Sequence, residues 1–358
     1  MRILVFQTAY LGDVVLTTPL LKTLKKRIPS AYVACAVQPA WAPVLENSGM
    51  LDKIITFDKR GVDTGAIGTL RLAMSLRKER FDVALCPHPS FRSGLILRLA
   101  GIPRRVGFET SSGRMFFTET LPKNEKEHEV RRVLSLAKAL GISDDDFVDQ
   151  PSVSPDPNLD ADAILERLGI EPGRFGLVGV HPGSVWATKR WLPEGFSSVC
   201  KAIARRGFTV LVFGNDEERP LVTQVVEGAD TERVVPCTGL TLPELIAVIN
   251  RLALYITNDS GPMHVACALG IPVIAIFGST VPDQGYAPYC EHAAVVETKR
   301  LDCRPCGPHG HDSCPLDNFL CMKNVHPESV LLAARVLSGG FADSGFIKVL
   351  LNDDYADG

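Results

Sequence analysis

Short apolar runs alternate along the chain with longer stretches in which apolar residues recur every three or four positions. The short runs predict buried strands, and the periodic stretches predict amphipathic helices. Such an alternation indicates a parallel sheet that helices cover on both faces. In the first part of the chain we expect strands at Ile3–Phe6, Tyr32–Val37, Ile54–Phe57, Val83–Cys86 and Arg105–Gly107, and helices at Val14–Arg27, Leu70–Arg80 and Phe91–Ala100.

A second run of the same alternation follows an acidic stretch, ISDDDFVDQPSVSPDPNLDAD, which contains three prolines and is typical of a linker. The helix expected before it covers Glu127–Leu140. After it we expect strands at Phe175–Val180, Thr209–Phe213, Arg233–Val235, Leu254–Thr257 and Val273–Phe277, and helices at Pro193–Arg206, Glu217–Glu227, Leu242–Asn250 and Met263–Leu269.

The predicted fold class is therefore α/β, with two doubly wound, Rossmann-like domains. We expect one domain over residues 1–155 and a second over residues 156–337. The tail, residues 338–358, either packs back on the first domain or is partly disordered. Ligands of open α/β sheets bind at the carboxyl ends of the strands, so two such domains predict a cleft between them.

Composition is that of a globular protein, with 46% apolar and 22% charged residues and a formal net charge of −3. This charge gives no reason to expect nucleic acid as a partner. Residues 1–150 hold 22 Lys and Arg against 16 Asp and Glu, whereas the remainder holds 16 against 25. A basic first half favours an anionic substrate or membrane surface, with ordinary surface scatter as the alternative.

The chain begins MRILVFQ and runs directly into a predicted strand, without the pattern of a signal peptide. No apolar run approaches the roughly 20 residues that a membrane-spanning helix needs. We therefore expect a cytoplasmic protein.

The segment Leu254–Gly278 reads as one strand–elbow–helix–strand unit. Its elbow, Asp259–Ser260–Gly261, would direct free backbone N–H groups and the positive end of a helix dipole toward a ligand. This arrangement suits an anion with phosphate oxygens. His264 lies about one helical turn further, as a ligand contact or as a hydrogen-bonded structural histidine.

Gly12 and Asp13 follow the first strand. Asp13 could take a proton from a substrate hydroxyl, or it could be a routine cap of the following helix. Neither a GxGxxG fingerprint nor a GxxxxGK[ST] loop occurs in the sequence, which disfavours a simple dinucleotide oxidoreductase or a P-loop enzyme.

Three further loops follow predicted strands of the second half. HPGSVWATKR offers Ser184, Thr188 and Lys189 as donors to phosphate oxygens. Glu218 in FGNDEERP could accept hydrogen bonds from ribose hydroxyls, or belong to a solvated acidic helical turn. Leu240 could cover one face of a flat ring, or be a core leucine.

Four cysteines near the end, Cys303, Cys306, Cys314 and Cys321, begin with CxxC spacing, which is typical of a zinc site. The second pair lacks that spacing. A structural metal thus competes with free buried thiols or an oxidisable pair, and we assign no metal site and no cofactor.

In order and spacing, five motifs resemble the ADP-heptose:lipopolysaccharide heptosyltransferases of glycosyltransferase family 9. They are GDVVLTTPLL, HPGSVWATKRW, FGNDEE, TNDSGPMHVACALGIPVIAIFG and CRPC…CPL…CM, and they cover the chain to about residue 337. The cysteine-rich segment looks most like heptosyltransferase II-type members. The resemblance implies GT-B architecture, with two Rossmann-like domains facing across a cleft, and transfer of L-glycero-D-manno-heptose from ADP-heptose to inner-core lipopolysaccharide. It also implies inversion at the anomeric carbon without a required metal.

The resemblance implies roles for individual residues. Asp13 matches the family's catalytic aspartate, and Lys189 the basic residue on the donor phosphates. Ser184, the 259–261 turn and His264 match further donor contacts, whereas Glu218 and Leu240 align less securely with ribose and adenine contacts. The carboxylates and phosphates of the implied acceptor make basic residues candidate contacts, for which we take Arg60, Arg92, Arg104 and Arg105.

An acceptor anchored in the inner leaflet also implies peripheral contact with the inner membrane. Alternatives remain open at this point. The chain could be a GT-B transferase that uses another nucleotide sugar or acceptor, a nucleotide-sugar-binding protein without turnover, or an epimerase on the same fold.

Overall fold

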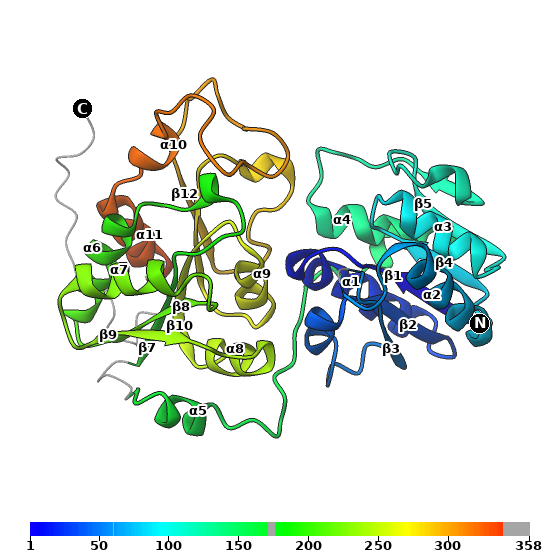
Figure 1. Ribbon diagram of the computed structural model, residues 1–358, viewed down its shortest axis with the longest axis horizontal. Coiled ribbons are helices and arrows are strands. Elements are labelled where there is room, and N and C mark those ends of the chain that lie inside the picture. Colours follow the sequence, from blue (N-terminus) through cyan, green and yellow to red (C-terminus); the bar gives the residue numbers. More distant parts are fainter. Residues whose placement is uncertain (60, 171–175, 339–358) are drawn as a thin grey trace.

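Two six-stranded parallel sheets organise the molecule, which is known from a computed structural model that describes residues 1–59, 61–170 and 176–338 (Figure 1). The N-terminal sheet has the order β3-β2-β1-β4-β5-β6, and the C-terminal sheet has the order β12-β11-β10-β7-β8-β9. The expectation of an α/β fold with two doubly wound domains is confirmed. The N-terminal strands are β1 Arg2–Phe6, β2 Tyr32–Val37, β3 Lys53–Thr56, β4 Val83–Cys86, β5 Arg104–Phe108 and β6 Glu119–Leu121.

Helices cover both faces of the N-terminal sheet because its central strands are buried on both sides. Leu4, Phe6 and Ala84 pack under α2 and α3, whereas Ile3 and Val5 point to the opposite face, under α1. The helices are α1 Leu11–Arg27, α2 Gly65–Glu79, α3 Phe91–Leu99 and α4 Glu129–Leu134, with 3-10 turns over Pro39–Val44, Arg114–Phe116 and Ser135–Leu140.

The C-terminal domain repeats this arrangement. One face of its sheet packs on α6, α7 and α11, and the other on α8 and α9. Its strands are β7 Leu177–His181, β8 Thr209–Gly214, β9 Val234–Thr238, β10 Leu252–Asn258, β11 Val273–Phe277 and β12 Ala293–Glu297. Its helices are α5 Ala161–Arg167, α6 Pro193–Ala204, α7 Arg219–Ala229, α8 Leu242–Ile249, α9 Gly261–Ala268, α10 Leu320–Lys323 and α11 Pro327–Ser338.

The two domains meet along α1 and α9, which lie between the sheets in Figure 1. A β-carbon at Gly12 would lie 2.8 Å from Cδ2 of His264, and one at Gly261 would lie 3.1 Å from Cβ of Leu11. Glycine at each helix start therefore allows the two backbones to approach closely. Because Leu11 and Val14 join Val265 and Ala266 in one hydrophobic cluster, the domains share a core at this contact.

The sequence pattern missed two edge strands, β6 and β12, and three helices, α5, α10 and α11. The edge strands β6 and β12 are only half-buried along their length and contain Glu119 and Glu297, so neither reads as a fully apolar run. Helix α5 begins inside the predicted linker, because Asp160 caps it by accepting the backbone N–H of Asp162 at 2.9 Å. The division expected at residue 155 falls in the irregular stretch before α5.

Other boundaries differ locally. The single helix expected over 127–140 is α4 followed by a 3-10 segment. Phe175, the expected first residue of β7, and the tail from residue 339 lie outside the described residues. In the part of the chain that the structure describes, no helix is both long and apolar enough to cross a membrane.

Candidate functional site

A cavity of about 700 Å³ lies between the carboxyl ends of the two sheets. Loops of both domains line it, as predicted for facing doubly wound sheets. The N-terminal domain contributes the start of α1 and the 3-10 turn with Trp41. The C-terminal domain contributes the loops after β7, β8, β10 and β11. Of the predicted donor or catalytic residues, ten line this cavity: Gly12, Asp13, Ser184, Lys189, Glu218, Leu240, Asp259, Ser260, Gly261 and His264.

Asp13 is the carboxylate that the N-terminal domain presents to the cavity. It lies in the first turn of α1, where its Oδ2 accepts the backbone N–H of Tyr10 at 3.2 Å. Burial and then the nearby Glu129 carboxylate raise the pKa of Asp13 to about 6, against the opposing effects of the Tyr10 N–H and Lys123. At neutral pH such a group is mostly ionised and still basic enough to accept a proton from a hydroxyl. Asp13 thus both caps α1 and lines the cavity.

Lys189 and Asp259 form a buried ion pair on the opposite side of the cavity. Lys189 Nζ lies 2.6 Å from Asp259 Oδ2, and the hydroxyl of Thr280 donates to the same oxygen at 2.7 Å. Both charged side chains are nearly buried, with 14% and 8% of their surfaces exposed. Since Asp259 already holds the ammonium group at the cavity wall, Lys189 is positioned for an anion without much further loss of side-chain freedom.

The elbow after β10 adds backbone donors beside this lysine. Ser260 has extended backbone angles and precedes α9, and Gly261 is the first helical residue. The hydroxyl of Ser184, which follows β7, donates to the carbonyl of Asp259 at 3.3 Å and so joins the two loops. An oxyanion at this point would meet the amino end of α9 together with the Lys189 ammonium group.

His264 lies at the contact between the domains. Its side chain is almost fully buried, and burial lowers its pKa to about 4, with the Asp259 carboxylate opposing this shift. The imidazole is therefore neutral at physiological pH. Its Nδ1 is buried and has no hydrogen-bond partner among the described residues.

The other end of the cavity is apolar. Trp41 and Ala40 come from the N-terminal domain, and the rest of the wall comes from the C-terminal domain. This composition suits a flat aromatic group such as a nucleobase. The C-terminal residues of this wall are Phe213, Cys237, Leu240, Leu242 and Leu245.

Glu218 stands between the apolar and anion-binding ends. Its carboxylate accepts the N–H of Asn215 at 3.0 Å and lies 3.4 Å from His181 Nε2. Although burial alone would raise the pKa of Glu218, His181 and the Asn215 N–H hold it below its usual value. A β-carbon at Gly183 would lie 2.0 Å from Glu218 Oε1, so a larger residue there would displace this carboxylate. The result is an ionised acceptor where ribose hydroxyls would be expected.

Thr188 does not line the cavity, although it was expected to contact the donor. It is buried, and its hydroxyl exchanges hydrogen bonds with the backbone of His311 at 2.8 and 3.0 Å. Thr188 therefore anchors the cysteine-rich loop, from which Pro308 and His309 reach the cavity wall.

The predicted acceptor arginines also lie elsewhere. Arg104 and Arg105 are at the start of β5, whereas the cavity lies at the carboxyl ends of the strands. Arg104 pairs with Glu119 at 2.7 Å, and Arg105 donates to the carbonyl of Phe116 at 2.7 Å. Both arginines therefore lie away from the candidate site. A count of charges in the sequence could not show this, because it does not tell at which end of a strand a charged residue lies.

Arg92 likewise serves its own domain. It donates to the Thr69 hydroxyl at 2.8 Å and to the carbonyl of Asp63 at 2.5 Å, and its guanidinium lies over the ring of Phe57. It is not among the residues that line the cavity. Arg60 lies outside the described residues.

The four cysteines of the 303–321 segment are free thiols in the structure. Among the described residues, no group of three or more His, Cys, Asp or Glu side chains is arranged to hold a metal ion. A residue outside the 303–321 segment contacts it: the Cys306 N–H donates to the carbonyl of Ser279 at 2.7 Å.

Several residues near the site carry no sequence motif. Lys123 and Arg132 pair with Glu129 at 3.0 and 3.1 Å, and Glu129 and Lys123 act electrostatically on Asp13. Arg132 also donates to the carbonyl of Gln284, across the domain boundary, at 3.0 Å. Lys123, Glu129 and Arg132 follow β6, and a polar segment after a strand is a signal for a site. The signal could not be used, because the sequence pattern did not reveal β6.

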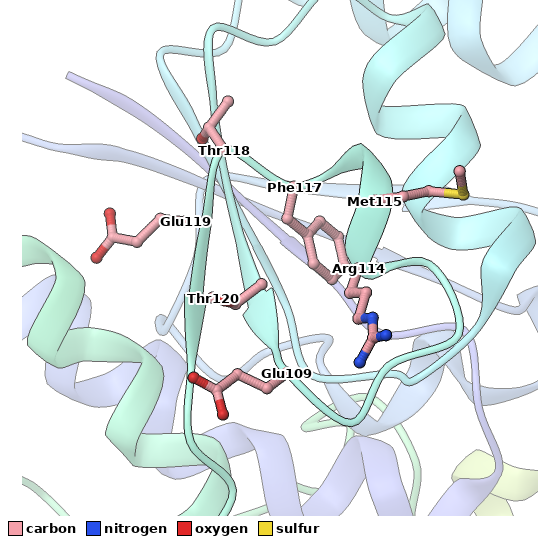
Figure 2. Close-up of a pocket in the computed structure, with 7 residues that line it drawn as sticks. All are labelled: Glu109, Arg114, Met115, Phe117, Thr118, Glu119 and Thr120. Carbon is pink, nitrogen blue, oxygen red and sulfur yellow. The ribbon is translucent and has the colours of Figure 1, made fainter.

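A second hollow, of about 540 Å³, lies in the N-terminal domain between the 3-10 turn Arg114–Phe116 and β6 (Figure 2). It shares no lining residue with the cavity between the domains. Glu109, Arg114 and Glu119 give it a mixed charge.

Comparisons with known proteins agree with this geometry. The model of the family described as "Glycosyltransferase family 9 (heptosyltransferase)" matches residues 69–316. Lipopolysaccharide heptosyltransferase 2 of Escherichia coli K12 is 29% identical over 83% of this chain and 87% of its own length. Lipooligosaccharide heptosyltransferase 2 of Campylobacter jejuni is 27% identical over 94% of this chain and 98% of its own.

Solved structures give the same picture. A family 9 glycosyltransferase from Veillonella parvula superposes with a TM-score of 0.82 at 28% identity, over 94% of this chain and 96% of that one. E. coli ADP-heptose lipopolysaccharide heptosyltransferase II superposes with a TM-score of 0.77 at 24% identity, over 96% of this chain and all of that one. The chain therefore belongs to glycosyltransferase family 9, and it is a glycosyltransferase of the two-domain GT-B architecture.

Proposed function

We propose that this enzyme transfers L-glycero-D-manno-heptose from ADP-heptose to the inner core of lipopolysaccharide, with inversion at the anomeric carbon. The observation that carries the proposal is the pairing across one cavity of a basic carboxylate, Asp13, with an anion seat made of Lys189 and the 259–261 turn. The names of the relatives support the choice of sugar and acceptor.

The donor would lie along the C-terminal wall. Its adenine would occupy the apolar end beside Leu240, its ribose would bind to Glu218, and its pyrophosphate would lie at the amino end of α9. Lys189 would then be shared between Asp259 and the phosphates. As the glycosidic C–O bond breaks, its electron pair leaves with ADP, and a fixed cation and helix dipole stabilise that developing charge.

The acceptor would approach from the N-terminal domain, for which we propose the bounds 1–155, with residues 156–337 as the donor domain. An acceptor hydroxyl would attack the anomeric carbon on the face opposite to ADP, as its proton passes to Asp13. This single displacement forms one C–O bond and breaks one, and it inverts the configuration. We further propose that the enzyme works at the cytoplasmic face of the inner membrane, where its acceptor is anchored.

Binding of another nucleotide sugar is the nearest alternative, because the apolar end of the cavity would admit other bases. A panel of ADP-, UDP- and GDP-linked sugars separates these cases. We expect the melting temperature to rise with ADP and ADP-heptose and to change little with the UDP and GDP compounds. Equal shifts with all three classes, or a shift with UDP or GDP compounds alone, would contradict the proposed donor.

Turnover separates a transferase from a binding protein or an epimerase. A transferase releases ADP only when an acceptor is present, whereas an epimerase converts the nucleotide sugar without any acceptor. We expect ADP release from ADP-heptose to depend on a heptose-deficient inner-core acceptor. Conversion of the donor alone would support the epimerase.

A further inference from the structure

Helix α2 has apolar side chains on two opposite faces. Its inner face, with Leu72 and Leu76, is buried against the N-terminal sheet. On its outer face Ile67, Leu70 and Met74 are 76%, 54% and 46% exposed. These three residues have the spacing that places side chains on one side of a helix. An ordinary surface helix would have polar residues here, so this face is suited to a partner.

The charged residues of the outer face are almost all basic. Arg71, Arg77 and Lys78 are exposed, and Arg71 pairs with Asp63 at 3.2 Å. Glu79, at the end of α2, is already paired with Arg2 and Lys53. Within the described ranges, no carboxylate lies at ion-pair distance from Arg77 or Lys78. The outer α2 face, meaning Ile67, Leu70, Arg71, Met74, Arg77 and Lys78, therefore combines exposed apolar area with uncompensated positive charge.

The elements beside α2 also carry exposed apolar and basic residues. Helix α3 lies beside α2 on the outer side of the domain (Figure 1), and Phe91 and Leu99 on it are exposed. Met115, on the adjoining 3-10 turn, is 74% exposed. Arg98, also on α3, is exposed. Residues 59–118 contain 11 Lys and Arg against four Asp and Glu.

We propose that the outer α2 face, with the exposed residues of α3 and the 3-10 turn, docks on the surface of a bilayer that contains anionic lipids. Apolar side chains would enter the headgroup boundary while the cations bind lipid phosphates. Charge complementarity favours this occupant over a second copy of the chain, because two copies of a basic face repel each other. The inference deepens the proposed function, and it rests on that function for the lipid-linked acceptor.

The topology places the starts of α2 and α3 at the same edge of the sheet as the cavity. Helices α2 and α3 begin after the carboxyl ends of β3 and β4, which is the edge of the sheet where the cavity opens. Ile67 and Phe91, in the first turns of these helices, therefore lie toward that edge. A bilayer in contact with them would hold a lipid-linked acceptor beside the N-terminal side of the cavity.

Co-sedimentation with vesicles tests the proposal without any catalytic step. One set of vesicles contains phosphatidylglycerol and phosphatidylcholine in equal parts, and the other contains phosphatidylcholine alone. The apolar variant is Ile67→Ser/Leu70→Ser/Met74→Ser, and the charge variant is Arg71→Gln/Arg77→Gln/Lys78→Gln. Leu332→Ser/Val336→Ser is the matched control, because Leu332 and Val336 are exposed apolar residues on α11 of the other domain. Circular dichroism and the melting temperature establish that each variant is folded.

We expect the wild-type protein to bind the anionic vesicles and not the neutral ones. Binding should weaken when salt rises from about 0.1 M to about 1 M, since the Debye length falls from about 10 Å to about 3 Å. Each triple variant should bind ~10-fold more weakly or worse, and the control should bind like the wild type.

Equal binding to both vesicle types, or retention of binding in both triple variants, would overturn the proposal. A dimer of the wild type that the triple variants abolish would assign the face to a second copy instead. Turnover of a soluble, delipidated acceptor should be unchanged in the triple variants. If vesicle binding persists while ADP-heptose gives no product, the proposed function fails and the docking surface stands.

Discussion

Gly12 of the N-terminal domain lies against the buried imidazole of His264 in the C-terminal domain, so closely that a β-carbon on Gly12 would lie 2.8 Å from His264 Cδ2. The contact joins the starts of α1 and α9 beside the cavity. It fixes Asp13, the next residue after Gly12, relative to the anion seat at Gly261. Packing between the domains thus sets the separation of Asp13 from the 259–261 turn.

Gly12→Ala should therefore disturb the domain contact. We expect it to lower the free energy of unfolding by about 1–3 kcal/mol through overpacking, although alanine is the better helix former. Turnover should fall by more than binding of ADP, because the added methyl group separates the two domains. The measurements are urea unfolding and steady-state kinetics. The double variant Gly12→Ala/His264→Ala should lose less stability than the sum of the single variants, and strict additivity would contradict the contact.

The pKa of Asp13 makes a prediction about pH and stability. This pKa is raised from 3.8 to about 6 in the folded state, so the folded protein favours the protonated carboxyl. The group therefore destabilises the fold progressively as pH rises from about 4 to 6, and by a constant amount above that. Because Asp13 is half-buried, we expect Asp13→Asn to stabilise the protein at pH 7 by only about 1–3 kcal/mol. The gain should vanish below pH ~4, and an equal gain at both pH values would contradict the raised pKa.

Glu129 should tune this titration. Its carboxylate raises the pKa of Asp13, so Glu129→Gln should move the acidic limb of the pH–rate profile to lower pH by roughly half a unit. Glu119→Gln is the matched control, since Glu119 pairs with Arg104 away from the cavity. A profile that does not move, in a folded Glu129→Gln protein, would show that Asp13 does not govern that limb.

Removing Lys189 should affect stability and donor binding together. Lys189→Met leaves the Asp259 carboxylate buried without its cation, which should cost about 3 kcal/mol. Lys138→Met breaks the exposed pair with Asp144 and should cost less than about 1 kcal/mol. Lys189→Met/Asp259→Asn should recover part of the stability, because the unpaired charge is gone, while ADP binding stays weak. Calorimetry with ADP and denaturant unfolding separate the two effects, and normal ADP affinity in the double variant would contradict the role of Lys189.

The sequence pattern predicts which loops lie at the cavity, but not where a charged residue lies along a strand or which way a side chain in a loop points. Lys189 and Asp259 follow predicted strands of one sheet, and parallel strands bring their carboxyl ends to one edge, so the pattern predicted that they meet. Asp13 follows a strand of the other sheet, and the predicted cleft between the two sheets placed it opposite them. Arg104 and Arg105 do not line the cavity, because they lie at the start of β5 and charge does not reveal position along a strand. Thr188 lay in the correct loop, but its side chain faces the cysteine-rich segment.

Other parts of the site depend on contacts between distant segments. Trp41 reaches the cavity only because the 3-10 turn that contains it packs beside α8 of the other domain. Lys123 and Glu129, which follow the unrecognised strand β6, act electrostatically on Asp13 through space. Neither relationship leaves a periodic or local signal in the sequence.

The central claim is that Asp13 is the base and that Lys189 and the 259–261 turn bind the leaving group. Single-turnover kinetics of Asp13→Asn with ADP-heptose and a heptose-deficient inner-core acceptor test it most directly, with ADP affinity measured on the same protein. We predict an unchanged affinity for ADP, transfer slower by about 10²–10⁴-fold, and a wild-type product with inverted anomeric configuration. Transfer at the wild-type rate by Asp13→Asn, or a product with retained configuration, would contradict the account.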